Sequence, residues 1–294
     1  MPESSSQIEE EIKSLEEEMQ SGNFWDDKNH AQVVIKKIKE LKDARAGVSV
    51  IDKGNAILTI LAGAGGDDSE DFAKMLLEMY FAYTKRQKWD YSFIHDNTND
   101  HGGYRNVTIE ITGKNVYGNL KNESGVHRLV RISPFNAKSL RHTSFALVEV
   151  LPIIPEVERK PISPDDIRIE LSKSGGPGGQ NVNKRETAVR IVHIPTNIAV
   201  HVASERSQEQ NRQKALEILS SKIYKLEEEK RKAEVEGRQI SKTTEIEWGN
   251  QIRSYVLHPY KMVKDHRTDI ETSDVEKVLK DGELDNFIEA EQKL

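Results

Sequence analysis

The first apolar pattern of the chain has the period of an α-helix. Apolar side chains recur at steps of four and three residues, first at Ile8, Ile12, Leu15 and Met19, and again at Val34, Ile38 and Leu41. Side chains at this spacing share one face of a helix. Residues 24–27 interrupt the stripe. We therefore expect a helical hairpin over residues 6–43, followed by a boundary within residues 47–54.

The pattern then changes to one of mixed strands and helices. Residues 56–62 are a continuous apolar run of strand length, and a segment with apolar residues at helical spacing follows Gly65 and Gly66. The acidic residues Asp67 and Asp68 at the start of that segment suit the dipole of a helix N-terminus. Apolar residues alternate over residues 107–111, as in a half-buried strand, and residues 145–154 form another apolar strand.

A second, smaller sheet is predicted on both sides of a glycine-rich segment. Apolar residues alternate over residues 167–171 before the segment and over residues 189–191 and 198–200 after it. A long helix follows, with an apolar stripe at Leu216, Leu219, Ile223 and Leu226. The patterns together predict a multidomain α+β protein. Its parts are a helical region (1–47), a mixed domain (48–160), a domain of small sheet and long helix (161–247) and a C-terminal segment (248–294) that packs on the mixed domain.

Composition removes several classes of protein. The chain has no apolar run long enough for a membrane span, and its N-terminus does not have the pattern of a signal peptide. The absence of cysteine excludes disulfides, thiolate zinc sites and cysteine nucleophiles. We expect a cytoplasmic protein without a membrane partner, a metal or a cofactor.

The distribution of charge changes the meaning of the net charge of −6. Residues 1–24 hold seven Glu and one Lys, so the remainder sums to zero. Residues 173–214 hold seven Lys or Arg against three Glu, and residues 117–142 hold five against one. Contacts with phosphates need such local positive charge and not a high overall pI. Either basic segment could equally be a solvated face.

The glycine-rich segment is the most informative stretch of the chain. It reads Ser174-Gly175-Gly176-Pro177-Gly178-Gly179-Gln180. Glycines allow positive φ and close approach of the backbone to a partner. The chain holds neither of the glycine patterns that cradle nucleotide phosphates. The segment is therefore either an ordinary loop or a tip that acts mostly through its backbone.

Four segments, in this order along the chain, resemble the class I peptide chain release factors. Residues 125–135 and 141–145 look like the codon-reading strand and loop of the bacterial release factor 2 branch. Gly178-Gly179-Gln180 matches the Gly-Gly-Gln motif, with residues 190–196 and 206–208 as its surroundings. Residues 248–255 resemble the segment after the long helix. The resemblance covers about residues 55–294, and it implies that residues 48–160 recognise a codon and residues 161–247 form the catalytic domain.

The resemblance implies that the tripeptide Ser133, Pro134 and Phe135 belongs to the branch that reads UAA and UGA. The Ser133 hydroxyl can both donate and accept a hydrogen bond, so it suits adenine or guanine at the second position. Stop codons are single-stranded RNA, which proteins read by stacking bases and bonding their edges. His142 offers a face for stacking, and Thr143 offers a hydroxyl for the third base. Taken alone, the tripeptide would be an ordinary turn.

The first base of the codon is read in the family by a helix tip with backbone groups and a carboxylate. The corresponding residues here are Gly66 and Asp68. The family usually has glutamate at the position of Asp68, so either Asp67 or Asp68 could make the contact. The alternative is a helix start with acids that match its dipole.

The resemblance also implies the reaction, which is hydrolysis of the ester between the nascent peptide and the transfer RNA, promoted only within the ribosomal peptidyl-transferase centre. The family uses the backbone N–H of the motif glutamine, here Gln180, as a donor to the oxyanion, and one such donor is typically worth roughly 10²–10³ in rate. Gly178 and Gly179 let this backbone bend. Gln180 is also the expected site of methylation by a glutamine methyltransferase.

Further expectations follow from the same resemblance. Lys184, Arg185 and Arg206 are candidate RNA-binding residues. The expected hinge between an open and a compact form of the protein is the segment of residues 239–248, which ends at Trp248. The partners would be the ribosome at its decoding and peptidyl-transferase centres, the stop codon and the P-site peptidyl-tRNA, bound by a monomer. Pro177 stands where alanine is common, and the helical region before Gly65 is shorter than usual in the family.

Two other functions stay open at this point. One is a rescue hydrolase that frees stalled ribosomes without a stop codon, against which the intact Ser133-Pro134-Phe135 and His142 argue. The other is a ribosome-binding factor without catalytic activity, against which Gln180 argues.

Overall fold

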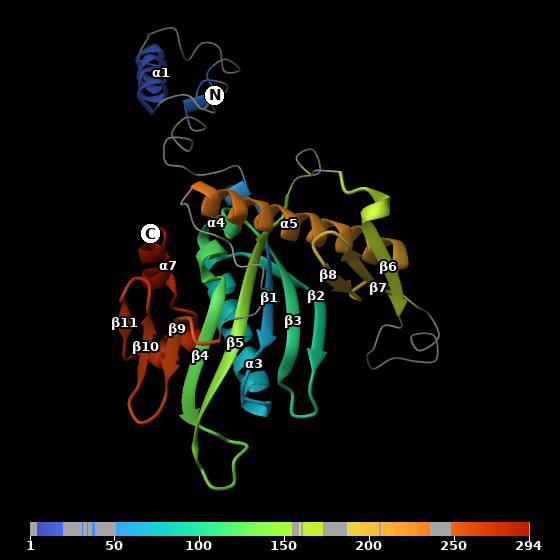
Figure 1. Ribbon diagram of the computed structural model, residues 1–294. Coiled ribbons are helices and arrows are strands. Elements are labelled where there is room, and N and C mark those ends of the chain that lie inside the picture. Colours follow the sequence, from blue (N-terminus) through green and yellow to red (C-terminus); the bar gives the residue numbers. More distant parts are fainter. Residues whose placement is uncertain are drawn as a thin grey trace. The chain divides into compact units, whose positions relative to one another are not determined.

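The computed structural model of the protein describes residues 5–19, 31, 34, 37–38, 51–154, 159, 161–172, 187–205, 207–235 and 248–293. The chain divides into two compact units, Met1–Lys53 and Gly54–Leu294. Figure 1 labels the elements of both units.

The first unit is helical. Helix α1 spans Ser5–Glu18, residues 31, 34, 37 and 38 are also helical, and η2 (Ile51–Lys53) ends the unit. Ala31, Val34 and Ile38 form a small buried cluster, against which Leu15 and Met19 pack. The two apolar stripes of the sequence therefore meet, as the predicted hairpin requires. Residues 24–27 and Leu41 lie outside the described residues.

The second unit contains an eight-stranded sheet in the order β11-β10-β9-β4-β5-β1-β3-β2. Its strands are β1 (Ala56–Ala62), β2 (Asp90–Thr98), β3 (Tyr104–Thr112), β4 (Gly125–Ile132), β5 (Arg141–Pro152), β9 (Gln251–Val256), β10 (Met262–Asp265) and β11 (Glu271–Thr272). Neighbouring strands pair antiparallel, except β4 and β9, which pair parallel. The strand predicted over residues 56–62 is confirmed, as are those around residues 107–111 and 145–154.

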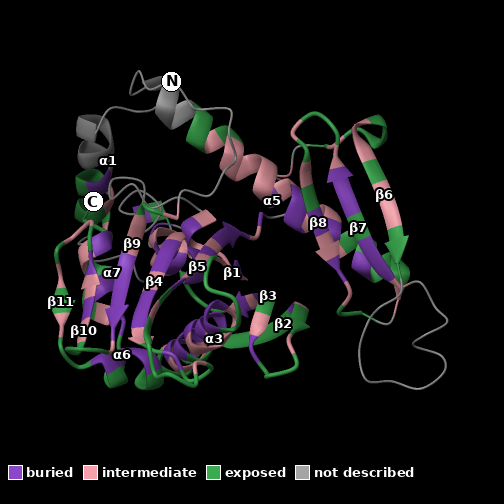
Figure 2. Ribbon diagram, turned by 60° about the horizontal axis from the view of Figure 1, so that its bottom comes forward, coloured by how far each residue is buried: buried purple, intermediate pink, exposed green. Residues whose placement is uncertain are grey.

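Helix α3 (Asp67–Gln87) packs on this sheet and contacts β1, β3 and β5. Phe72, Leu76, Met79 and Tyr80 on its apolar face are fully buried, and Figure 2 shows much of the α3 ribbon in the colour of buried residues. The shorter helices are α4 (Val116–Leu120), η3 (Lys121–Glu123), α6 (Val275–Asp281) and α7 (Asp285–Glu291). Strands β9–β11 belong to the C-terminal segment, so this segment completes the sheet.

The smaller sheet has the order β6-β7-β8 and is antiparallel throughout. Its strands are β6 (Ile167–Ser172), β7 (Ala188–His193) and β8 (Ile198–Val202), with η5 (Pro164–Asp166) before them. Helix α5 (Gln208–Val235) packs on β7 and β8. The predicted small sheet and long helix are therefore confirmed.

The smaller sheet and the large sheet share one apolar cluster. Val189 and Ile191 of β7 and Leu219 of α5 belong to it, together with Ile57 and Leu151 of the large sheet. Ion pairs join the same elements: Lys214 lies 2.5 Å from Glu110, and Lys222 lies 2.7 Å from Glu149. Among the described helices, we find none that is both long and apolar enough to cross a membrane.

Candidate functional site: a codon-reading surface

Strands β4 and β5 form a hairpin that carries most of the predicted codon-reading residues. The register runs from Gly125 opposite Val148 to Ile132 opposite Arg141. The loop of residues 133–140 joins the strands, and the Ser133 N–H closes it by donating to the Leu140 carbonyl at 3.0 Å. We call β4, β5 and this loop the reader hairpin; its loop projects at the lower edge of Figure 1.

The predicted tripeptide divides into a buried and an exposed part. Ser133 is 3% exposed, and its Oγ accepts a hydrogen bond from the Phe135 N–H at 3.1 Å. Phe135 is 42% exposed, and its ring lies 6.0 Å from that of His101 in the β2–β3 turn. In this structure Ser133 therefore supports the turn, while Pro134 and Phe135 face outward.

Asp68 links the start of α3 to both strands of the reader hairpin. Its Oδ1 accepts from Arg131 of β4 at 3.0 Å, and its Oδ2 lies 2.8 Å from Nδ1 of His142 on β5. Burial alone would raise the pKa of Asp68, but hydrogen bonds from Ser133, His142 and Arg131 outweigh burial and hold the pKa below its usual value. Asp68 is thus an ionised anchor that binds three groups of its own chain. We call Asp68, Arg131 and His142 the reader cluster.

Two glycines bring the helix start this close to β5. A Cβ added to Gly65 would lie 2.9 Å from the Ser144 hydroxyl, and Gly65 has φ +140°. Gly66 has φ +59°, and its carbonyl accepts from the N–H groups of Ser69 and Glu70. The Phe145 N–H donates to the Ala64 carbonyl at 3.0 Å. The helix tip and the reader hairpin therefore form one surface.

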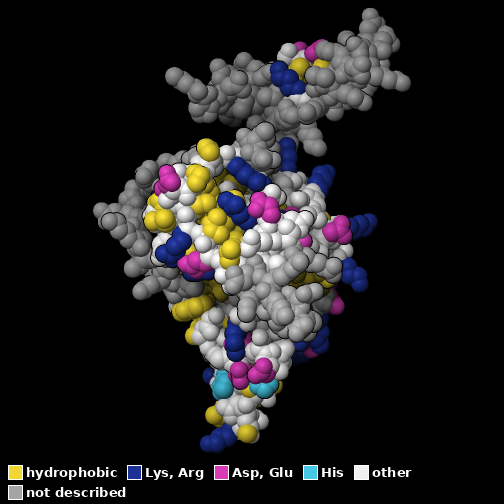
Figure 3. Space-filling model, turned by 90° about the vertical axis from the view of Figure 1, so that its right-hand side faces the viewer, with side chains coloured by type: hydrophobic (Ala, Val, Ile, Leu, Met, Phe, Trp, Pro, Cys, Tyr) yellow, Lys and Arg dark blue, Asp and Glu magenta, His cyan; other side chains and the backbone are white. Residues whose placement is uncertain are grey.

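The other predicted reader residues lie on this surface. The His142 side chain is 38% exposed, and its Nε2 lies 3.0 Å from the side-chain nitrogen of Asn136. Thr143 and Asp67 are exposed. Histidine, acidic and basic side chains gather at the lower end of the view in Figure 3, where the reader hairpin lies. Sequence reasoning assigned no role to Arg131, which lies within the quoted segment 125–135, or to Asn136, which follows it directly.

Trp248, the predicted hinge residue, lies directly behind the reader surface. Its ring centroid is 6.4 Å from that of Phe145, and its ring fills the space beside Gly63, where an added Cβ would lie 2.2 Å away. Trp248 therefore packs between Gly63 and Phe145 of the reader hairpin.

The predicted catalytic tip is described only at its base. Residues Gly178, Gly179, Gln180, Lys184, Arg185 and Arg206 lie outside the described residues. Ser172 of β6 and Ala188 of β7 are paired neighbours, so the segment between them leaves and returns at one place. Asn211 of α5 is fully buried and holds this base, because it donates to the carbonyls of Thr187 and Glu205 at 2.8 and 3.0 Å.

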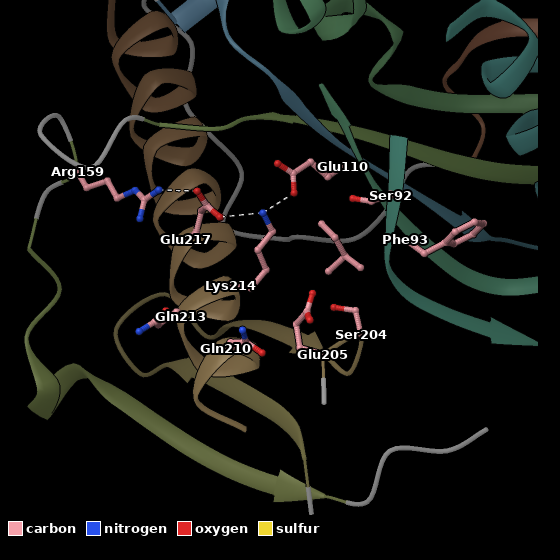
Figure 4. Close-up of a pocket in the computed structure, with 11 residues that line it drawn as sticks. Ser92, Phe93, Glu110, Arg159, Ser204, Glu205, Gln210, Gln213, Lys214 and Glu217 are labelled. Atoms are coloured by element: carbon pink, nitrogen blue, oxygen red, sulfur yellow. Dashed lines mark hydrogen bonds and ion pairs between the residues drawn. The ribbon is translucent and has the colours of Figure 1, made fainter. Parts of the chain in front are cut away.

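A cavity of about 420 Å³ lies between α5 and strand β2, as Figure 4 shows. Four of its charged side chains pair with one another: Lys214 bonds Glu110 and Glu217, and Arg159 bonds Glu217 at 2.5 Å. Burial lowers the pKa of Lys214, but the two carboxylates more than compensate and raise it. In the described part of the chain no cluster of side chains could hold a metal ion. The ion pairs that line the cavity link α5 to Glu110 of the large sheet and to Arg159.

Comparisons with known proteins agree with this arrangement. The sequence matches the PCRF domain over residues 47–148 and the RF-1 domain over residues 155–267. It is 43% identical to Peptide chain release factor 2 of Petrotoga mobilis, over 97% of this chain and 90% of that protein. It is 48% identical to Peptide chain release factor 2 of Thermotoga maritima, over 90% of this chain and 73% of that protein.

A solved structure, RF2 of Thermus thermophilus, matches the fold with a TM-score of 0.74 at 41% identity, over 96% of this chain and 80% of that chain. The chain therefore belongs to the peptide chain release factor family.

Proposed function

We propose that this chain recognises UAA and UGA in the ribosomal A site and triggers hydrolysis of the P-site peptidyl-tRNA. The observation that carries the proposal is the reader cluster. Asp68, Arg131 and His142 come from three separate elements, and Asp68 bonds both of the others. The predicted reader residues are thereby gathered on one partly open surface, as recognition of a single-stranded codon requires.

The exposed groups of this surface have the chemistry for reading bases. His142 and Phe135 present ring faces, and base–aromatic stacking contributes about 1–3 kcal/mol per base. Thr143 adds an exposed hydroxyl, and Gly66 adds exposed backbone groups at the helix tip. The Ser133 hydroxyl accepts from the Phe135 N–H and donates to Asp68, so a change in the loop that releases the bond to Asp68 would free its proton for a base. It suits adenine and guanine alike once the loop opens toward the codon.

The reaction is assigned to the tip. A water oxygen attacks the ester carbonyl carbon, and the bond to the ribose oxygen of the transfer RNA breaks. The proton released by the water ends on that ribose oxygen. The Gln180 N–H donates to the oxyanion, while Gly178 and Gly179 allow its backbone to approach. Lys184, Arg185 and Arg206 contact RNA phosphates, and Gln180 is the site of methylation by a glutamine methyltransferase.

Codon reading and catalysis fall to different regions of the chain. Residues 48–160 with 248–294 read the codon, residues 161–247 carry the catalytic tip, and Trp248 ends the hinge between them. The protein acts as a cytoplasmic monomer that needs no cofactor.

The test is peptide release from ribosomes programmed with UAA, UGA, UAG, a sense codon or no A-site codon. We expect release on UAA and UGA only. Gln180→Pro, which removes the N–H donor, should abolish release and preserve binding to UGA-programmed ribosomes. Release without a codon would instead identify a rescue hydrolase, and no release under any condition would identify a binding factor without catalysis.

A further inference from the structure

We propose that Asn136 is a positioning residue for codon reading, which holds His142 as a neutral imidazole protonated on Nδ1 and thereby fixes the ring plane offered to the codon. This inference rests on the proposed codon-reading role of His142. Asn136 lies in the loop of the reader hairpin, and its side chain contacts the edge of the imidazole that faces away from Asp68.

Nδ1 of His142 faces a carboxylate. It lies 2.8 Å from Oδ2 of Asp68. Asp68 is ionised, because its pKa lies below the usual value and Arg131 pairs with it at 3.0 Å. An ionised carboxylate can only accept hydrogen bonds. Nδ1 must therefore carry the proton.

Nε2 of His142 faces the side-chain amide of Asn136. The amide of an asparagine has a donor side and an acceptor side that look alike, so its orientation has to be read from its partners. Oδ1 of Asn136 is 2.8 Å from the backbone N–H of Lys138, which can only donate. The NH2 group therefore faces His142 and donates to Nε2 at 3.0 Å. Nε2 is then an acceptor without a proton, and the imidazole is neutral.

Two hydrogen bonds in the plane of the ring, one at each nitrogen, fix that plane and leave both faces of the ring free of them. The side chain of His142 remains 38% exposed. The loop supports Asn136 in turn, because the Ser139 N–H donates to the Asn136 carbonyl at 2.9 Å. A ring ordered before the codon arrives loses less conformational freedom on stacking, which favours binding.

The direct test is the nitrogen NMR spectrum of histidine in the free, full-length chain at neutral pH, with the His142 signals identified by their loss in His142→Gln. The wild type should show a protonated Nδ1 and an unprotonated Nε2. Asn136→Asp keeps the acceptor for Lys138 and puts a carboxylate beside Nε2, so both nitrogens should become protonated. Asn136→Ala removes the donor and should give a mixture of tautomers, whereas Ala137→Ser, an exposed neighbour in the same loop, should match the wild type.

The functional test is release as a function of factor concentration on UAA and UGA. Asn136→Ala removes one hydrogen bond that orders the ring. It should raise the concentration for half-maximal release about three- to tenfold and leave the maximal rate within about twofold. Ala137→Ser should change neither value.

An unchanged tautomer pattern in Asn136→Ala, or an unchanged concentration dependence in a variant whose tautomers are mixed, would overturn the proposal. A wild type that ignores UAA and UGA would refute the proposed function instead, and the spectrum of the free chain would still decide how His142 is held.

Discussion

An arginine–carboxylate cluster lies at each end of strand β4, and the two clusters differ in how much of their side chains is exposed. Near the end of β4, the side chain of Arg131 is 12% exposed and that of His142 38% exposed. Just before β4, Glu123 pairs with Arg253 of β9, and both side chains are fully buried. The open cluster keeps surface for a ligand. The closed one must satisfy its charges internally, since an unpaired buried charge is very costly.

The closed cluster joins the C-terminal segment to the rest of the second unit. Arg253 binds both oxygens of Glu123, at 2.9 and 2.6 Å, and also contacts Asp265 and Glu291. The Tyr80 hydroxyl of α3 donates to Glu123 at 2.8 Å. We call Arg253, Glu123, Asp265, Glu291 and Arg267 the Arg253 cluster. The Arg253 cluster holds β9 beside β4. Because β4 is one strand of the reader hairpin, the cluster also stabilises the position of that hairpin.

The largest expected effect comes from removing Arg253 from the Arg253 cluster, which is the closed cluster of the comparison. Arg253→Met leaves Glu123 and Asp265 short of positive charge in a buried site, and we expect the free energy of unfolding to fall by about 3–5 kcal/mol. The same substitution at the open end, Arg131→Met, leaves the buried Asp68 with its contact to the partly exposed His142 and should cost less, about 1–2 kcal/mol. Urea unfolding of both variants measures the difference. Equal losses would show that burial does not separate the two clusters.

The sequence predicted the elements of this architecture better than their assembly. Periodicity predicted β3, α3 and α5, because each has an apolar face that repeats at its own spacing, and a continuous apolar run predicted β1. It did not predict that β9 pairs parallel with β4, since no local pattern specifies a partner strand more than a hundred residues away. Nor did it find the Arg253 cluster. Each of its members looks like an ordinary surface residue in the sequence.

The candidate site shows the same limit. The resemblance identified Ser133 and His142 by their motifs. It could not show that Ser133 is buried, or that Asp68 binds a histidine 74 positions further along the chain. Such contacts depend on how α3 meets the reader hairpin. The catalytic tip remains a prediction from its motif, because its residues lie outside the described part of the chain.

The second-largest expected effect is a dependence of stability on pH, caused by the buried His127 of β4. Burial first, and then the charge of Arg253, lowers the pKa of His127 to about 4. The unfolded state, with a pKa of about 6.5, therefore binds the proton more readily. Neutral His127 makes its full contribution to the free energy of unfolding above about pH 6.5. This contribution is lost as the pH falls toward about 4. We expect a loss of roughly 2–3 kcal/mol over that range.

The matched variant for this prediction is His127→Gln, which keeps polar atoms next to the Glu123 carbonyl and Tyr255 but does not titrate. Unfolding measured in urea from pH 4 to 7 should show a smaller slope for the variant than for the wild type. Parallel pH profiles would show that the closed cluster tolerates a protonated histidine.

The smallest expected effect is at Glu291, and it tests how the closed cluster balances its charges. Two guanidiniums, Arg253 and Arg267, face three carboxyl groups, so the charges of the cluster would balance if one of the three carboxyl groups were protonated. Burial, and then the nearby charge of Glu123, raises the pKa of Glu291 to about 9. Its Oε2 is buried and finds no hydrogen-bond partner among the described residues, which suits an uncharged group better than a carboxylate.

Because the folded-state pKa of Glu291 lies above the unfolded value, the wild type loses stability from this group as the pH rises from about 4.5 toward about 9. Glu291→Gln supplies a neutral group of the same shape at every pH. At pH 7 the variant should be as stable as the wild type or more stable by about 1 kcal/mol, and its stability should vary less between pH 5 and 9. Glu123→Gln is the control, since it removes a carboxylate that the balance needs and should destabilise the fold. Urea unfolding of both variants decides the point, because a strong loss in Glu291→Gln at pH 7 would mean that the cluster carries three negative charges.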